Sequence, residues 1–278
     1  MWRRLLGRLG LAVSIAFLAM PAGAAEPQVY KLAVVPQFDL RRLQSVWGPI
    51  VEQLQNATGA KFELVLEPGI PAFEKGLQAG AYDIAYMNPY HYVIASKRQG
   101  YRAILRDVDE MLYGIVVVRK TSAVVDIHAL DGLTVAFPSP NAMGAALIPR
   151  AEFATKFAIK VKEKYVKSHS SAYLNVLMGE ADAAGGIKAT FEQQPSEIKD
   201  GLRILYETDR YMPHPVAVHP RLSAVMAGKV QAELLALGAR PAGAALLAEV
   251  PFRRLGIAVD SEYDQLRKLG LDAFYVEP

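Results

Sequence analysis

The hydrophobic residues of this chain alternate between short continuous runs and stripes with helical spacing. The run 32–35 is apolar at every position, which is typical of a strand buried on both faces. Apolar side chains then recur on one face of a helix over 43–54, and Gly59 closes that helix. Pro49 is expected either to open the helix at its first turn or to kink it. The same rhythm predicts strands at 62–66, 83–86, 101–108 and 111–119, with helices at 70–78 and from the Asn88-Pro89 turn to 97.

A second unit with the same rhythm follows the linker 121–126. Its predicted strands lie at 133–137, 162–167, 181–187 and 203–207, and its predicted helices at 142–157, 169–178 and up to 194. Helices rich in Ala and Leu follow at 222–237, 241–247 and 262–269. Strands that alternate with helices in this way indicate mainly parallel sheets flanked by helices.

The chain is expected to cross between the two units twice. It leaves the first unit near Tyr113 and returns to it near Val216, and two such crossings make a hinge. We therefore predict lobe 1 at 26–115 and 216–278, and lobe 2 at 116–215. A ligand would lie in the cleft between them, at the carboxyl ends of strands and the amino ends of helices.

The net charge of +3, from 31 basic and 28 acidic residues, belongs to the first 25 residues. That segment has three arginines, an apolar run over 9–20 and a small-residue exit, which predicts a cleaved secretory signal peptide. The apolar run is too short to span a membrane, and no later stretch is long enough either. The remaining chain is formally neutral, which argues against nucleic-acid binding.

The absence of cysteine removes several classes of protein. Disulfides, thiolate metal sites and cysteine nucleophiles are excluded, and so is a lipoprotein anchored through a cysteine. An exported chain with no anchor is expected in the periplasm. The sequence has no Walker A loop, GxGxxG or HExxH motif and no convergent nucleophile, so we expect no enzyme, no cofactor and no metal site.

Many short motifs resemble one known family in their order and spacing. The matching residues are Trp47-Gly48-Pro49, Leu54, Thr58-Gly59, Phe73, Gly80-Ala81-Tyr82-Asp83-Ile84-Ala85, Asn88-Pro89, Tyr92, Ala95, Leu130-Asp131-Gly132, Pro138-Ser139, Gly144, Pro149, His169, Gly179, Asp182, Pro213-His214-Pro215 and Pro220. Over nearly the whole exported chain, the sequence is similar to the periplasmic solute-binding proteins of phosphate, phosphite and phosphonate ABC importers.

The resemblance implies an α/β protein with the two-lobed, type II periplasmic binding protein fold and a two-strand hinge. The implied function is capture of a small oxyanion in the cleft between the lobes and delivery to an inner-membrane ABC permease. One branch of the proteins that this chain resembles serves sensor kinases rather than transporters. A ligand-sensing accessory protein for a membrane histidine kinase is therefore an alternative. Another small ligand, such as a quaternary amine, is a further alternative.

The resemblance places the oxyanion at the amino end of a lobe 2 helix, in a short hydroxyl-rich loop before a glycine. Here that loop lacks the hydroxyl donors, so backbone N–H groups and the helix dipole would have to hold the anion. The candidate ligand-binding residues of this loop are Asn141, Ala142, Met143 and Gly144, and Ser139, which precedes the loop, is a further candidate. The alternative is an ordinary Asn cap on a helix.

A second strand-to-helix junction carries His169 and Ser170, which the resemblance also places near the ligand. A capped helix with a surface histidine would explain the same residues. In lobe 1 and the hinge, the candidates are Gln37, Tyr86, Asn88 and Tyr113, which lie near predicted strand ends. Aromatic side chains there could line the cleft or could simply pack in the core.

Overall fold

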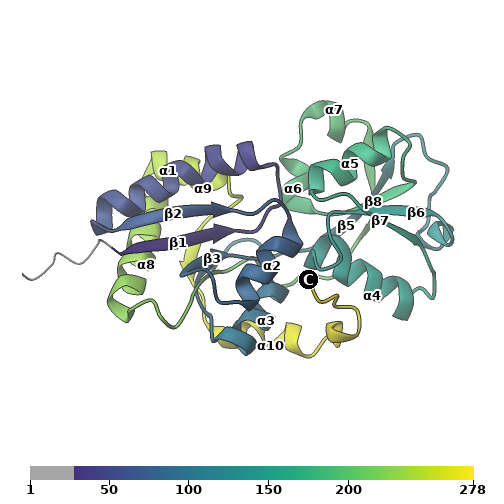
Figure 1. Ribbon diagram of the computed structural model, residues 1–278. Coiled ribbons are helices and arrows are strands. Elements are labelled where there is room, and N and C mark those ends of the chain that lie inside the picture. The colour runs from purple at the N-terminus through teal and green to yellow at the C-terminus, as the bar shows by residue number, and fades with distance from the viewer. Residues whose placement is uncertain (1–27) are drawn as a thin grey trace, which may run out of the picture.

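The first of two sheets in the computed structural model is built from both ends of the chain (Figure 1). Residues 28–278 are described, so the signal peptide expected at 1–25 lies outside the described residues. The strand order is β11-β4-β10-β3-β1-β2. These strands are β1 (Val29–Val34), β2 (Lys61–Leu66), β3 (Ile84–Tyr86), β4 (Arg102–Asp107), β10 (Val216–Val218) and β11 (Leu255–Ile257). We call this part of the molecule lobe 1.

Two groups of helices cover the sheet of lobe 1 (Figure 1). One group contains α1 (Leu40–Thr58), α8 (Ala224–Ala239) and α9 (Pro241–Ala248), and the other contains α2 (Ile70–Gln78), α3 (Pro89–Gln99) and α10 (Asp264–Arg267). The apolar stripe predicted for α1 is buried, and Asp39 caps the helix by accepting a hydrogen bond from the backbone N–H of Arg42. Pro49 lies inside α1 rather than at its first turn, so that part of the prediction was wrong.

The second sheet has the strand order β7-β6-β8-β5-β9 and forms lobe 2. Its strands are β5 (Gly114–Arg119), β6 (Thr134–Phe137), β7 (Lys162–Tyr165), β8 (Ala183–Ile187) and β9 (Leu202–Glu207). Its helices are α4 (Ile148–Thr155), α5 (His169–Leu177), α6 (Lys188–Glu192) and α7 (Ser196–Lys199). A π-helical turn, Met143–Leu147, leads directly into α4. The core of lobe 2 under α5 contains Tyr173 and Val176.

Strand directions bring functional loops to one place. In lobe 1, β1 is parallel to β2 and β3, whereas β10 is antiparallel to β3 and β4. In lobe 2, β6 is parallel to β7 and β8, whereas β5 is antiparallel to β8 and β9. Both sheets are therefore mixed, because β5 and β10 enter their lobes from the hinge and run away from the cleft. The carboxyl ends of β1, β3, β6 and β8 face the cleft.

Two extended segments connect the lobes, as expected for a hinge. They are 108–113, between β4 and β5, and 208–215, between β9 and β10. The two segments pair with each other, since the N–H of Leu112 donates to the carbonyl of Tyr211 at 2.9 Å and the reverse bond measures 2.7 Å. The lobe boundaries predicted at 115 and 215 remain a prediction.

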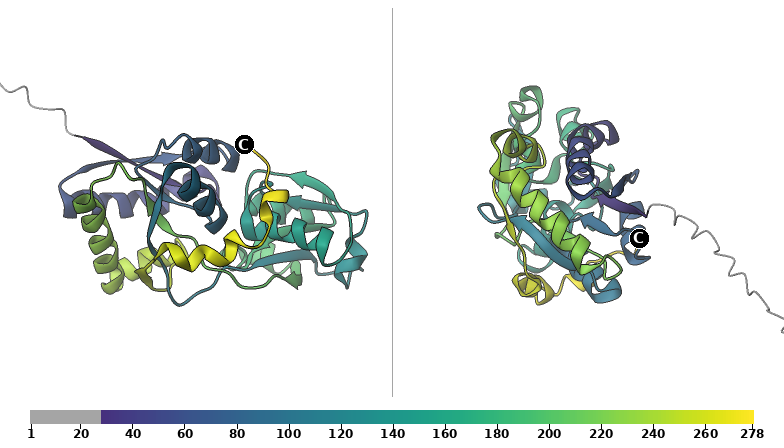
Figure 2. Two further views of the ribbon diagram at one scale, coloured as in Figure 1. Left: turned by 90° about the horizontal axis from the view of Figure 1, so that it is seen from below. Right: turned by 90° about the vertical axis from the view of Figure 1, so that its left-hand side faces the viewer.

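The C-terminal segment also links the lobes. After α10 the chain runs along the molecule from lobe 1 to lobe 2 (Figure 2, yellow). We call residues 271–278 the C-terminal strap. Within residues 28–278, no helix combines the length and the apolar character that crossing a membrane requires.

Candidate functional site

A small void lies where the two lobes meet, and we call it the polar void. Its volume is about 10 Å³, which is room for about one water molecule. No charged side chain lines it. The lining residues are Val35, Gln37, Ile70, Asn88, Ala142, Met143, Gly144, Ala145, His169, Ile187 and His214.

Backbone N–H groups are the main donors at the polar void. The π-helical turn begins there, and the N–H groups of Met143, Gly144 and Ala145 have no hydrogen-bond acceptor among residues 28–278. The first N–H groups of a helix have no partner inside the helix and carry its positive partial charge. The turn therefore presents three neutral donors to a small anion.

Two glycines allow this turn to approach the sheet of lobe 2. A Cβ atom on Gly114 of β5 would lie 2.0 Å from the carbonyl oxygen of Gly144. A Cβ atom on Gly185 of β8 would lie 1.9 Å from the carbonyl oxygen of Ala145. Any larger residue at either position would push the turn away from the sheet.

Two buried histidines face the same void and are neutral at neutral pH. Burial lowers the pKa of His169 and of His214 to about 3 in each case. His169 Nδ1 lies 3.2 Å from the hydroxyl of Thr190, and His214 Nε2 lies 3.4 Å from Nε2 of Gln37. A neutral imidazole keeps one N–H donor, so each ring offers one donor and one acceptor.

Most of the loop residues predicted from the sequence meet at the polar void. Ala142, Met143 and Gly144 line it together with His169, and Asn88 and Gln37 line it from lobe 1. Ala145 and His214 also line the void, although neither is among the site residues predicted from the sequence. His214 comes just before the strand that enters lobe 1 from the hinge. Because such a strand begins at the cleft, this position in the sequence could have indicated His214.

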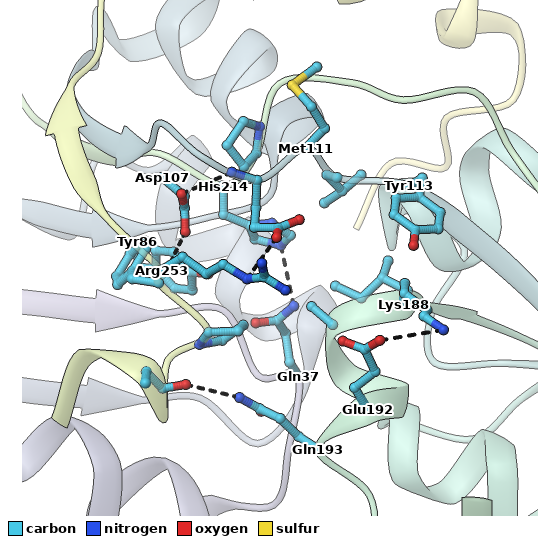
Figure 3. Close-up of a pocket in the computed structure, with 18 of the residues that line it drawn as sticks. Gln37, Tyr86, Asp107, Met111, Tyr113, Lys188, Glu192, Gln193, His214 and Arg253 are labelled. Carbon is cyan, nitrogen blue, oxygen red and sulfur yellow. Dashed lines mark hydrogen bonds and ion pairs between the residues drawn. The ribbon is translucent and has the colours of Figure 1, made fainter. Parts of the chain in front are cut away.

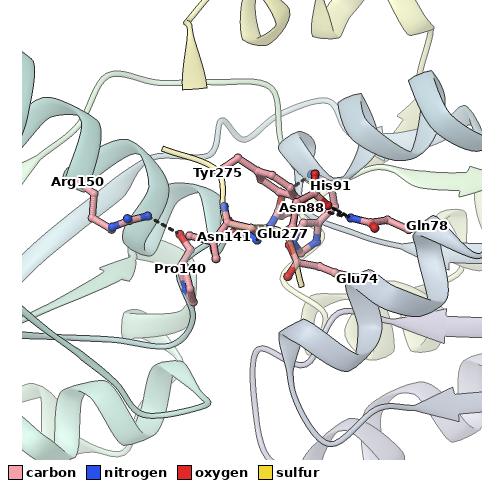
Figure 4. Close-up of polar contacts among 10 residues, drawn as sticks. Glu74, Gln78, Asn88, His91, Pro140, Asn141, Arg150, Tyr275 and Glu277 are labelled. Carbon is pink, nitrogen blue, oxygen red and sulfur yellow. Dashed lines mark hydrogen bonds and ion pairs between the residues drawn. The ribbon is translucent and has the colours of Figure 1, made fainter. Parts of the chain in front are cut away.

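Three of the residues predicted at the two strand-to-helix junctions of lobe 2, Ser139, Asn141 and Ser170, lie outside the lining of the polar void, and each has another environment. The amide of Asn141 donates to the carbonyl of Val276 at 2.6 Å and accepts from the N–H of Val276 at 2.9 Å (Figure 4). The hydroxyl of Ser139 is buried without a hydrogen-bond partner among the described residues. Ser170 is half-buried in the first turn of α5. The side chain of Asn141 thus anchors the strap.

The strap contacts both lobes around Asn141 (Figure 4). In lobe 2, Nη1 of Arg150 donates to the carbonyl of Phe274 at 3.0 Å. In lobe 1, the amide of Gln78 donates to the hydroxyl of Tyr275 at 3.1 Å, and Glu277 forms an ion pair with Arg98. The strap is therefore a third connection between the lobes, in addition to the two hinge segments.

Asn88 connects lobe 1 to the polar void and to a buried contact between a histidine and a glutamate. Its amide donates to the carbonyl of Asn141 at 3.1 Å, across the lobe boundary, and its oxygen accepts from the N–H of His91 at 2.8 Å. His91 Nε2 lies 3.0 Å from a carboxylate oxygen of Glu74, and both side chains are buried. Both the nitrogen and the oxygen of the Asn88 amide therefore already form hydrogen bonds within the protein.

A second, larger cavity lies beside the polar void, and we call it the large cavity (Figure 3). Its volume is about 620 Å³. The predicted residues Tyr86, Tyr113 and Gln37 line it. The other lining residues are Asp107, Glu110, Met111, Leu112, Ile187, Lys188, Ala189, Glu192, Gln193, Pro213, His214, Ala244, Ala248, Pro251, Phe252 and Arg253.

The lobes touch each other in this structure. The N–H of His169 donates to the carbonyl of Gln37 at 3.3 Å, and Nη2 of Arg42 donates to the side chain of Gln193 at 2.9 Å. Both bonds join lobe 1 to lobe 2 at the cleft. The polar void is small because the lobes are in contact.

Within residues 28–278, no three His, Cys, Asp or Glu side chains gather closely enough to hold a metal ion. The two histidines of the polar void have only neutral neighbours among its lining residues.

Comparison with known proteins identifies the family and the fold. The family described as "ABC transporter, phosphonate, periplasmic substrate-binding protein" matches residues 32–263. The phosphate-import protein PhnD of Mycolicibacterium smegmatis is 25% identical over 167 residues, which are 57% of this chain and 50% of that protein. The matched part of the chain therefore spans about half the length of this curated relative.

Solved structures show the same fold at low sequence identity. A binding protein component of an ABC phosphonate transporter from Pseudomonas aeruginosa has a TM-score of 0.80 and 17% identity, over 90% of this chain and 87% of that chain. PhnD1 from Prochlorococcus marinus, in complex with methylphosphonate, has a TM-score of 0.81 and 16% identity, over 90% of this chain and all of that chain. The expected two-lobed periplasmic binding protein fold is confirmed.

Proposed function

The chain belongs to the family of periplasmic substrate-binding proteins of phosphonate ABC transporters, and from this premise we propose that it captures a small oxyanion of the phosphate, phosphite or phosphonate type between its lobes. It delivers this ligand to an inner-membrane ABC permease. Members of this family bind substrates for transport, which agrees with the absence of catalytic motifs from the sequence. We propose that the chain works in the periplasm after removal of residues 1–25.

The observation that carries the proposal is the set of neutral donors at the polar void. The N–H groups of Met143, Gly144 and Ala145 have no acceptor among the described residues, and no carboxylate lines the void. Preorganised N–H groups in a dry site stabilise an anion without a countercharge, because their dipoles need little rearrangement. This supports binding of an oxyanion at the start of the π-helical turn.

The large cavity is a poor place for the anionic group itself. Three carboxylates, Asp107, Glu110 and Glu192, line it together with only two cationic side chains. A carboxylate near an anion raises its electrostatic energy. The charge distribution therefore favours the polar void for the anionic group.

An oxyanion needs more room than the polar void offers while the lobes are in contact. The hinge segments allow the lobes to part, and the ligand then replaces the contact between His169 and Gln37. Closure around the anion gives both lobes a share of its hydrogen bonds. The ligand thus shifts the population toward a closed, liganded form that the permease recognises.

The test is a thermal-shift screen of the protein purified from the periplasm. Phosphate, phosphite and methylphosphonate form one arm, and choline forms the cationic arm. A ligand at about 100 times its Kd stabilises the folded state by about 2.7 kcal/mol. We expect at least one oxyanion to raise the melting temperature. A rise with choline and none with any oxyanion would contradict the proposal.

A further inference from the structure

The large cavity adjoins the polar void, because three residues line both spaces. Gln37, Ile187 and His214 line both spaces, and the two polar members of this partition meet at 3.4 Å between their Nε2 atoms. A ligand whose anionic group sits at Met143 to Ala145 can therefore extend past the partition into the large cavity. The volume of about 620 Å³ falls in the range of pockets that hold organic ligands and far exceeds the size of a methyl group.

Every charged side chain that lines the large cavity already has a partner. Glu110 pairs with Arg253 at 2.7 Å, and Lys188 pairs with Glu192 at 3.4 Å. Asp107 is buried and accepts hydrogen bonds from the backbone N–H groups of residues 109, 110 and 253. No charged side chain of the lining is left without a partner to attract a charged ligand group, so the cavity suits an uncharged group.

The deep wall of the large cavity is aromatic. The ring of Tyr86 lies 5.2 Å from that of Trp47, 5.3 Å from that of Phe252 and 5.4 Å from that of His214. These contacts fix Tyr86 in place, and its side chain is buried. The lining of this cavity also includes the apolar residues Ile187 and Ala244. Such a surface gains free energy by covering an apolar or aromatic group.

We propose that the ligand is an oxyanion with a bulky, uncharged organic group, and that this group occupies the large cavity while the anionic group binds at the polar void. This inference rests on the proposed function, because it takes the oxyanion site as given. It adds a substrate class: organic phosphonates or phosphate esters with an apolar or aromatic body. Burial of that body against Tyr86 and Phe252 supplies affinity that a small oxyanion lacks.

The test compares ligands that differ only in the organic group. Isothermal titration calorimetry of the intact exported protein measures Kd for methylphosphonate, benzylphosphonate and 2-aminoethylphosphonate. We expect the Kd of benzylphosphonate to be at least about tenfold lower than that of methylphosphonate, because its ring buries apolar surface. We expect 2-aminoethylphosphonate to bind no more tightly than methylphosphonate. A benzylphosphonate Kd equal to or weaker than that of methylphosphonate overturns the inference, as does a preference for the amine.

Two variants on α9 assign the gain to the large cavity. Ala244→Phe fills the cavity, whereas Ala245→Phe places the same ring on an exposed position of the same helix that does not line it. Ala244→Phe should remove the advantage of benzylphosphonate, and Ala245→Phe should keep it. Equal loss of both ligands in Ala244→Phe, with a normal melting temperature, overturns the inference. The proposed function fails separately, when neither methylphosphonate nor phosphate binds the unsubstituted protein.

Discussion

The two hollows between the lobes share three lining residues but differ in chemistry. The polar void offers backbone N–H groups and neutral imidazoles and has no charged lining residue, whereas the large cavity combines an aromatic wall with charged side chains that are already paired. The first environment suits an anion, and the second suits a neutral organic group. The contrast indicates that one cleft can bind the charged group of a ligand in one place and its neutral organic group in another. The predictions below test the polar void and the residues around it, each against a matched control or a contrasting measurement.

The largest effect is expected from Gly114→Ala, which disturbs the polar void. Its Cβ would collide with the carbonyl oxygen of Gly144, so the π-helical turn has to move. Overpacking of this kind costs about 1–3 kcal/mol or more in the free energy of unfolding. We expect this loss in chemical denaturation, together with loss of detectable phosphonate binding in calorimetry.

Gly228→Ala is the matched control for this substitution. Gly228 lies on α8, and a Cβ there meets nothing within 4 Å. Alanine favours a helix over glycine by about 0.5–1 kcal/mol, so this variant should be slightly more stable and should bind normally. Normal phosphonate binding by Gly114→Ala would show that the π-helical turn does not hold the anion.

The buried histidines of the polar void predict a loss of stability in acid. The pKa of His169 and of His214 is about 3 in the folded protein and about 6.5 in the unfolded chain. The unfolded chain therefore binds more protons as the pH falls below 6.5. Each histidine therefore lowers the free energy of unfolding by about 1.4 kcal/mol for every pH unit between about pH 6.5 and pH 3. At pH 5 this loss amounts to about 2 kcal/mol.

Urea denaturation at pH 7 and pH 5 measures this difference. His169→Gln and His214→Gln should each reduce the difference in the free energy of unfolding between the two pH values. His128 is exposed and lines neither hollow, so His128→Gln should leave the difference unchanged. If neither buried substitution alters the pH dependence, the two imidazoles are not neutral neighbours of the anion site.

Asn141→Ala tests whether this residue anchors the strap or holds the ligand. The variant loses two hydrogen bonds to Val276, which should cost about 1–2 kcal/mol in the free energy of unfolding. The Kd for methylphosphonate should change by less than about threefold, because the amide is engaged with the strap. A large loss of affinity with normal stability would instead make Asn141 a ligand contact.

The smallest effect is a gain of affinity in Ala142→Ser. Ala142 lines the polar void, so a hydroxyl there adds a donor to the anion site. One net hydrogen bond is worth about 1 kcal/mol, which predicts about threefold to tenfold tighter methylphosphonate binding. Ala146→Ser is the control, because Ala146 is buried on the same turn and does not line the void. Equal gains of methylphosphonate affinity in both variants would show that the gain does not depend on a donor at the polar void.

Local patterns predicted the elements that have strong periodicity and clear end signals. The helix 70–78 was predicted with the bounds that the structure shows, because Gly80 and an apolar stripe define it. The three-residue strands β10 and β11 were not predicted as strands, since so short a segment gains its stability from neighbours in the sheet.

The candidate site shows the same limit. A strand-to-helix junction pointed to His169, and the structure places it at the polar void. The partner of Asn141 lies 135 residues away, at the end of the chain, so no local pattern could show that its amide is occupied. The pairing of Glu110 with Arg253 depends on the same kind of long-range contact. The sequence therefore indicates which loops reach the cleft but not which side chains are already used.

The most direct measurement is the response of individual backbone amides to methylphosphonate in ¹⁵N–¹H NMR spectra of the protein. We predict that the largest chemical-shift changes fall on the N–H groups of Met143, Gly144 and Ala145, because these groups donate to the anion. The amides of residues 188 and 253, beside the large cavity, should change much less. Changes centred on those two residues, with none at 143–145, would contradict the assignment of the anion to the polar void.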